Sequence, residues 1–174
     1  GKPAQDAFVD IEGSLTVHYV DVGQGDAALV VAPDGTAMLI DAGPNSAEDE
    51  LSGYIDALGI KRFTYVVFTH PHEDHIGGGD MIMRDYEVGT VIMPSAVSTT
   101  ATFERLIDAI DASGARAICA NDVVGMTYTL GSDIGAPEFT ILAPGANEYD
   151  DLNNSSVVLR LDYGGSSFLF TGDA

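Results

Sequence analysis

The stretch FTYVVFT (63–69) constrains the fold more than any other part of this 174-residue chain. It is a continuous apolar run rich in β-branched and aromatic residues, which is typical of a buried strand. Amphipathic helices are predicted on either side of the run, over 46–58 and 100–113. The order of elements therefore predicts an α/β fold with layers packed around sheets.

Both predicted helices carry boundary signals. In the first, Ser46 precedes three acidic residues, and apolar residues recur at helical spacing until Gly59. The second begins at Thr100 and ends before Gly114. The remaining expected elements are a hairpin turn at 33–36, a short helix at 80–86, and strands at 15–22, 28–32, 37–41, 88–93, 126–130, 138–143, 156–163 and 167–172.

The chain is strongly acidic, with 27 Asp and Glu against 7 Lys and Arg and a formal charge of −20. Proteins that bind duplex nucleic acid normally show a basic surface, so tight binding of duplex DNA is not expected. The length fits one domain, placed at 14–174 after an N-terminal extension at 1–13. No apolar run is long enough to cross a bilayer, and the single cysteine, Cys119, allows no internal disulfide.

Three of the four histidines lie in THPHEDHIGG (69–78), at the end of the apolar run. The cluster therefore follows the C-terminal end of a strand, where open α/β folds place their sites. Imidazole and carboxylate groups bind zinc and other divalent transition metals. Four such groups are too many for one simple chelate and suit two neighbouring ions, with His70 and His72 on one ion and Asp74 and His75 on the other.

The motif HPHEDH matches the HxHxDH signature of the metallo-β-lactamase fold superfamily. Two further stretches narrow this likeness, DVGQGDA (21–27) and LNNSSVVLRLDYGGSSFLFTGDA (152–174). Together they resemble the DNA-internalisation-related hydrolases, similar to the metallohydrolase domain of the ComEC/Rec2 competence proteins. The resemblance runs from about Leu15 to Ala174. It implies a metallo-β-lactamase-like αββα sandwich, in which two mixed sheets carry helices on their outer faces.

The resemblance also implies roles for single residues. His70 and His72 resemble ligands of a first metal, and Asp173 in TGD resembles the carboxylate that bridges both metals. Asp74 and Asp173 are the expected catalytic carboxylates. The metal ligands it implies are His70, His72, Asp74, His75 and Asp173. The residues it places behind these ligands or beside the substrate are Asp21, Gln24, Asp26, Asp41, Asn153 and Asn154, of which Asp41 supports the ligand loop by hydrogen bonds.

Two departures from the family pattern affect the site. Many relatives have another histidine ahead of the penultimate strand, where this chain reads DDLNNSS (150–156). Asn153 or Asn154 is therefore expected as a weaker oxygen ligand or as a hydrogen-bond donor to substrate. Relatives also continue past TGDA to a strand, a helix and a last metal-binding histidine. We expect this sequence to be an incomplete hydrolase domain, metal-poor and nearly inactive alone, that continues beyond Ala174.

The expected activity is metal-dependent hydrolysis. Two divalent ions, zinc or manganese, would lower the pKa of a shared water and provide hydroxide. Phosphoesters are the favoured substrates, including nucleic-acid phosphodiesters and phosphoesters of the cell envelope. The alternatives are a metal-bearing binding or regulatory module whose site has decayed, and a lactam or ester hydrolase. Secreted and lipid-anchored members of the resembled group indicate an extracellular or cell-envelope location, with the cytoplasm as the alternative.

Overall fold

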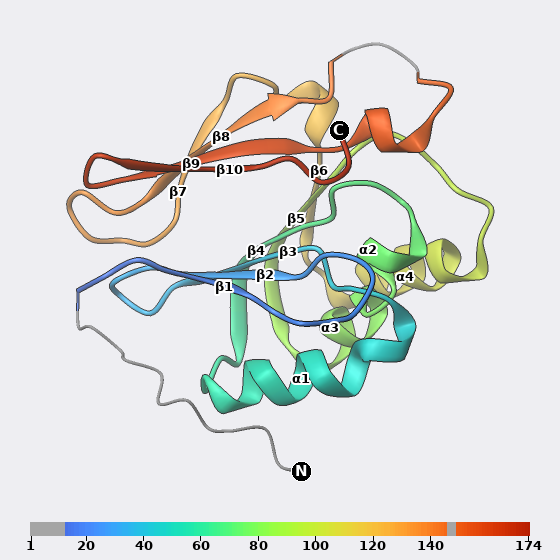
Figure 1. Ribbon diagram of the computed structural model, residues 1–174, viewed down its shortest axis with the longest axis horizontal. Helices are drawn as coiled ribbons and strands as arrows, with labels where there is room; N and C mark the ends of the chain where they lie inside the picture. The colour runs from blue at the N-terminus through green and yellow to red at the C-terminus, as the bar shows by residue number, and fades with distance from the viewer. Residues whose placement is uncertain (1–12, 146–148) are drawn as a thin grey trace.

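Two β-sheets face each other in the computed structural model, which describes residues 13–145 and 149–174 (Figure 1). The predicted N-terminal extension lies outside the described residues except for Gly13. The first sheet has the order β1-β2-β3-β4-β5-β6, and its strands are β1 (Thr16–Tyr19), β2 (Ala28–Val31), β3 (Ala37–Ile40), β4 (Arg62–Val67), β5 (Glu87–Met93) and β6 (Arg116–Cys119). The second has the order β10-β9-β8-β7, and its strands are β7 (Thr127–Thr129), β8 (Glu138–Ala143), β9 (Val158–Tyr163) and β10 (Ser166–Phe170).

The helical elements lie between these strands along the chain. The α-helices are α1 (Glu48–Ala57), α2 (Glu73–Ile76), α3 (Gly79–Asp85) and α4 (Ala101–Ser113). The 3-10 helices are η1 (Asn45–Ala47), η2 (Ala120–Asp122) and η3 (Leu152–Ser155). None of the helices in the described ranges is both long and apolar enough to cross a bilayer.

The first sheet is mixed, and β4 lies at its centre. The strands β1, β2 and β3 pair antiparallel, whereas β3, β4, β5 and β6 run parallel. The predicted hairpin turn at 33–36 joins β2 to β3. Phe63, Val66 and Val67 of β4 are fully buried, as expected for a strand with parallel neighbours and covered faces. The prediction of a buried strand here is confirmed.

The second sheet differs from the expectation of two mixed sheets, because all pairings among its described strands are antiparallel. Its strands follow one another in chain order, and β9 turns directly into β10 at Gly164–Gly165. Antiparallel neighbours can be joined by such short turns, whereas parallel neighbours need long crossovers. The α-helices α1 to α4 accordingly lie in the crossovers between the parallel strands of the first sheet.

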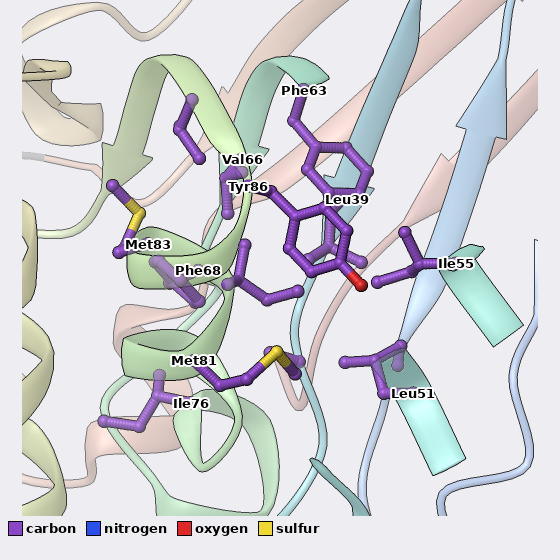
Figure 2. Packing of buried hydrophobic residues seen from close by; sticks show 14 of the residues in the cluster. Leu39, Leu51, Ile55, Phe63, Val66, Phe68, Ile76, Met81, Met83 and Tyr86 are labelled. Atoms are coloured by element: carbon purple, nitrogen blue, oxygen red, sulfur yellow. The ribbon is translucent and has the colours of Figure 1, made fainter. Parts of the chain in front are cut away.

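One hydrophobic core lies between the first sheet and the helices. Leu51 and Ile55 of α1 pack toward Phe63 and Tyr86 (Figure 2). Met81 of α3 belongs to the same cluster. This burial explains why the apolar positions of α1 recur at helical spacing. The structure corrects the start of α1, because helix α1 begins at Glu48 after η1 rather than being capped by Ser46.

A second core fills the space between the two sheets, with Phe139, Leu159 and Leu161 fully buried on the inner face of the second sheet. The outer face carries the exposed Leu169 together with paired polar side chains. Arg160 Nη2, for example, lies 2.7 Å from Asp162 Oδ1. The resemblance implied helices outside both sheets, but no α-helix of the described residues covers this outer face (Figure 1). The described layers are therefore helices, first sheet and second sheet.

Candidate metal centre

The histidine loop, defined as residues 69–76, follows β4 at the carboxyl edge of the parallel strands. Its backbone is more regular than the neighbouring glycines suggested. His72 is extended, with φ −82° and ψ 145°, and the next four residues form α2. The extended residue followed by one helical turn brings His75 back toward His70, with ring centroids 4.2 Å apart. The loop thus gathers the histidines at one end of the sheet.

Two neighbouring segments hold α2 in place. Asp26 N donates to Asp74 O at 3.3 Å, and Ala42 N donates to His75 O at 2.7 Å. These bonds satisfy carbonyl groups that a short helix leaves without partners at its end. The first segment approaches so closely that a Cβ on Gly25 would lie 2.0 Å from Asp74 O. Gly25 is therefore required for this contact.

Asp41 lies directly beneath the histidine loop and is 1% exposed. Its Oδ1 accepts from Thr69 N at 2.7 Å, and its Oδ2 accepts from Thr69 Oγ1 at 2.6 Å and pairs with His75 Nδ1 at 2.8 Å. Asp41 also has a φ of +57°, which is uncommon for a residue other than glycine. Such a backbone persists only where the surroundings hold it, and here three hydrogen bonds do so.

The imidazole and carboxylate atoms converge above this aspartate. His70 Nε2 lies 3.1 Å from His72 Nδ1. Two nitrogens bound about 2.0–2.1 Å from one tetrahedral ion would be roughly 3.3 Å apart, so this pair fits a shared ion. Asp173 follows β10 and points its Oδ1 at His75 Nε2, at 3.4 Å, and its Oδ2 at His70 Nε2, at 3.9 Å. The carboxylate therefore lies between two histidines.

The two buried histidines differ in charge. Burial, together with the neighbouring His75 and His72, lowers the pKa of His70 to about 4, so its imidazole is neutral near pH 7. Burial also acts to lower the pKa of His75, but the hydrogen bond and negative charge of Asp41 outweigh it and raise this pKa to about 8. A neutral imidazole is the form that binds metals, which His70 already provides.

The structure separates the predicted ligands into groups. Among the described residues, two sets of three ligand atoms lie within 4.8 Å of one another. The sets are His70, His75 and Asp173, and Asp26, Asp41 and His75. His72 and Asp74 are in neither set. The negative charge of Asp74 nevertheless acts to raise the pKa of both His70 and His75, against the effect of burial.

The other predicted residues differ in their burial and hydrogen bonds. Asp21 Oδ1 accepts from Gly23 N at 3.2 Å and so shapes its own turn. Gln24 and Asn154 are exposed. The Oδ1 atom of Asn153 is buried and, among the described residues, has no hydrogen-bond partner. Of the two asparagines, Asn153 is therefore the one whose unpaired acceptor atom is buried.

Sequence reasoning missed two hydroxyl groups that contact His70. Thr69 Oγ1 lies 3.1 Å from His70 Nδ1, and Ser156 Oγ lies 3.3 Å from the same nitrogen. For Thr69, its position next to the histidine was an available signal. Ser156 is distant in the sequence and stands in a run of small polar residues, so only the folded chain brings it to the site.

The fold is similar to several solved structures. A Cronobacter sakazakii metallo-β-lactamase with a HARLDQ motif aligns with a TM-score of 0.59 and 20% identity, over 89% of this chain and 58% of that one. The diiron β-hydroxylase CmlA from Streptomyces venezuelae gives a TM-score of 0.55 and 19% identity, over 92% and 29%. Igni18, a metallo hydrolase from Ignicoccus hospitalis, gives 0.53 and 21%, over 91% and 60%. At these identities, the likenesses concern the fold.

Two curated proteins are similar in sequence. ComE operon protein 3 of Bacillus subtilis is 28% identical over 174 residues, which cover 90% of this chain and 22% of that protein. Recombination protein 2 of Haemophilus influenzae is 30% identical over 165 residues, which cover 91% and 18%. The chain spans less than a quarter of the length of either relative. The family model described as the metallo-beta-lactamase superfamily matches residues 20–174. With the matching sandwich fold, this match shows that the chain belongs to the metallo-β-lactamase superfamily.

Proposed function

We propose that this metallohydrolase-family chain hydrolyses phosphoesters in a metal-dependent reaction, with nucleic-acid phosphodiesters as the favoured substrates. The observation that carries the proposal is the convergence of donors at the end of β4. His70 Nε2 and His72 Nδ1 are 3.1 Å apart, and the two oxygens of Asp173 face His70 and His75. This donor set suits a divalent transition metal.

We assign His70 and His72 to a first ion, Asp74 and His75 to a second, and Asp173 as the bridge between them. The position of the Asp173 carboxylate between two histidines supports the bridge. Zinc or manganese is the proposed metal, with the buried Oδ1 of Asn153 as a further oxygen donor at the first ion. When bound, a pair of such ions supplies Lewis acidity and activates water at neutral pH.

The residues of the chain itself orient this donor set. Asp41 occupies His75 Nδ1 at 2.8 Å, so Nε2 is the nitrogen that faces Asp173. The side chain of Asp173 is 41% exposed, so it can contact both the histidines and a substrate at the surface. We place the catalytic carboxylates at Asp74 and Asp173, and Asp26 and Asp41 as groups that hold the ligands from behind. Loss of such supporting groups typically costs about 10–100-fold in affinity or activity.

The choice of phosphodiesters rests on the relatives and on charge. One relative is named as a recombination protein, and recombination acts on DNA, which favours a phosphodiester over a lactam. The net charge of −20 disfavours tight binding of long duplexes. A single strand or a small phosphodiester therefore fits better. We also propose an extracellular or cell-envelope location, as for the secreted members of the resembled group.

The test combines metal analysis with activity. The chain, purified without chelator and reloaded with Mn²⁺ or Zn²⁺, is compared with a His72→Ala, Asp74→Ala double variant by elemental analysis. Turnover of bis-p-nitrophenyl phosphate, a labelled single-stranded oligonucleotide and nitrocefin is then measured. We expect metal binding and phosphodiester cleavage that are weak in this chain alone and absent from the double variant. Equal metal content in both proteins would refute the centre, and bound metal without turnover would favour a binding or regulatory module.

A further inference from the structure

A single buried hydroxyl group, that of Ser156, links the two sheets beneath the proposed metal centre. Ser156 lies between η3 and β9 and is fully buried. The next residue, Val157, donates its backbone N to Thr69 O at 2.8 Å, which fixes this segment of the second sheet against the end of β4. Ser156 N itself donates to Asn153 O at 2.9 Å, so the backbone that carries the hydroxyl is fixed on both sides.

The Ser156 hydroxyl contacts two of the proposed ligand segments. Its Oγ is 3.3 Å from His70 Nδ1 and 3.3 Å from the backbone N of Asp173. A backbone N can only donate, so Ser156 Oγ accepts from Asp173. The turn that carries Asp173 is seated closely, because a Cβ on Gly172 would lie 3.1 Å from Ser156 Oγ and 2.8 Å from Thr69. One oxygen atom thus sets the position of the turn relative to the histidine loop.

The hydrogen atoms around His70 can be assigned from its neighbours. Thr69 Oγ1 has one hydrogen and lies 2.6 Å from Asp41 Oδ2, a carboxylate oxygen, so it donates that hydrogen to Asp41. Toward His70 Nδ1, 3.1 Å away, Thr69 can then only accept. His70 Nδ1 therefore carries a hydrogen that lies between Thr69 Oγ1 and Ser156 Oγ. Its Nε2 is left with a free lone pair directed at His72.

We propose that Ser156 is a positioning residue for metal binding, a role that rests on the proposed metal centre. Its hydroxyl helps to hold His70 in the tautomer that leaves Nε2 free, and it fixes the Asp173 turn so that the carboxylate meets the histidines. Ser156 does not act as a nucleophile, because its side chain is fully buried. Groups that orient ligating imidazoles change metal affinity about 10–100-fold when they are lost.

The chain contains a matched control in the adjacent residue. Ser155 is also buried, but its Oγ donates to Leu152 O at 2.6 Å and belongs to η3. We expect Ser156→Ala to lower Co²⁺ affinity, measured by competition with a chromophoric chelator, by about 10–100-fold. The visible absorption spectrum of bound Co²⁺ should change as well. Ser155→Ala should leave the affinity and the spectrum unchanged.

Further measurements separate positioning from simple stability. Ser156→Cys retains the shape of the side chain but offers only a weak acceptor, so it should lower affinity even where it folds as well as the unchanged chain. Unchanged Co²⁺ affinity and spectrum in Ser156→Ala, or equal losses in Ser155→Ala, would overturn the proposal. In the metal-free chain, long-range ¹H–¹⁵N spectra should show His70 as the Nδ1–H tautomer, and the Nε2–H tautomer would also overturn it. No Co²⁺ binding by the unchanged chain would refute the centre itself.

Discussion

His75 Nδ1 lies 2.8 Å from Asp41 Oδ2, and both side chains are almost fully buried. The pair joins the histidine loop to the end of β3, and the Asp41 charge raises the pKa of His75 to about 8 against the effect of burial. A histidine whose pKa is higher in the folded chain than in the unfolded chain binds protons preferentially in the folded state. Its stabilising contribution is therefore complete below pH 6.5, the ordinary pKa, and is lost as the pH rises through about 8.

The metal-free chain should therefore become less stable on the alkaline side. We expect the free energy of unfolding, measured by urea titration in EDTA, to fall by about 2 kcal/mol between pH 6.5 and pH 9. Asp41→Asn removes the charge that raises the His75 pKa and should abolish most of this fall. Asp56→Asn, an exposed carboxylate paired with Lys61, serves as the control and should retain it. An equal slope in Asp41→Asn and the unchanged chain would contradict the role of the pair.

Gly25 should be essential where Gly23, two positions earlier, is not. Gly25 has a φ of +119° and a Cβ there would lie 2.0 Å from Asp74 O, whereas Gly23 has a φ of +77° and nothing lies within 4 Å of its Cβ position. Gly25→Ala should cost at least about 2 kcal/mol of stability and weaken metal binding, because α2 must shift. Gly23→Ala should cost about 1 kcal/mol. Chemical denaturation of both variants measures the difference, and equal costs would contradict it.

Glu73 should anchor α2 to the helix layer. Its Oε1 accepts from Asn45 N at 2.8 Å and from Asn45 Nδ2 at 2.6 Å, and Asn45 Oδ1 accepts from Arg105 at 2.7 Å. Glu73→Ala should destabilise the chain by about 1 kcal/mol. Glu73→Gln retains the acceptor oxygen and should recover part of this loss. Thermal unfolding compares them with Glu104→Ala on the exposed side of α4, and a loss no greater than in that control would argue against the anchor.

Asn153 should matter for metal binding and Asn154 should not. Asn153 has a buried Oδ1 without a partner among the described residues, whereas Asn154 is exposed. A buried acceptor without a hydrogen bond is costly unless it binds something. Asn153→Ala should therefore lower the affinity for the first Mn²⁺ or Zn²⁺ ion, measured by calorimetric titration, without lowering metal-free stability. Identical titrations for Asn153→Ala and Asn154→Ala would show that Asn153 Oδ1 does not bind the metal.

Sequence patterns predicted the elements that bury a long apolar face. The boundaries of α4 follow from its side chains, because Thr100 Oγ1 accepts from Phe103 N and Gly114 ends the helix with a φ of +73°. The strand β6 was missed because it has only four residues, of which Arg116 and Ala117 are exposed at the sheet edge. The helix α2 is also four residues long, which is too short to show a periodic pattern.

Spacing alone could predict only the part of the site that shares a local motif, which is the group of histidines. Asp41, at the end of the predicted strand 37–41, and Asp173 could be expected only from the family resemblance. Ser156 reaches His70 from the other sheet, and no spacing rule relates residues that meet only through the packing of two sheets. The position of Asp74 could not be predicted either, because it depends on how α2 is held by its neighbours.

The position of Asp173 between His70 and His75 has a consequence for the order in which the ligands come together during folding. The histidines and Asp41 belong to the first half of the chain, whereas Ser156 and Asp173 are synthesised later, with β9 and β10. Contacts between residues so distant in sequence form late and slowly, because a large loop must close first. A metal ion present during synthesis would therefore meet the three histidines before Asp173 is in place. Docking of the second sheet would then bring Asp173 to the ion, so that the joining of the two sheets and the binding of the metal by Asp173 are the same event.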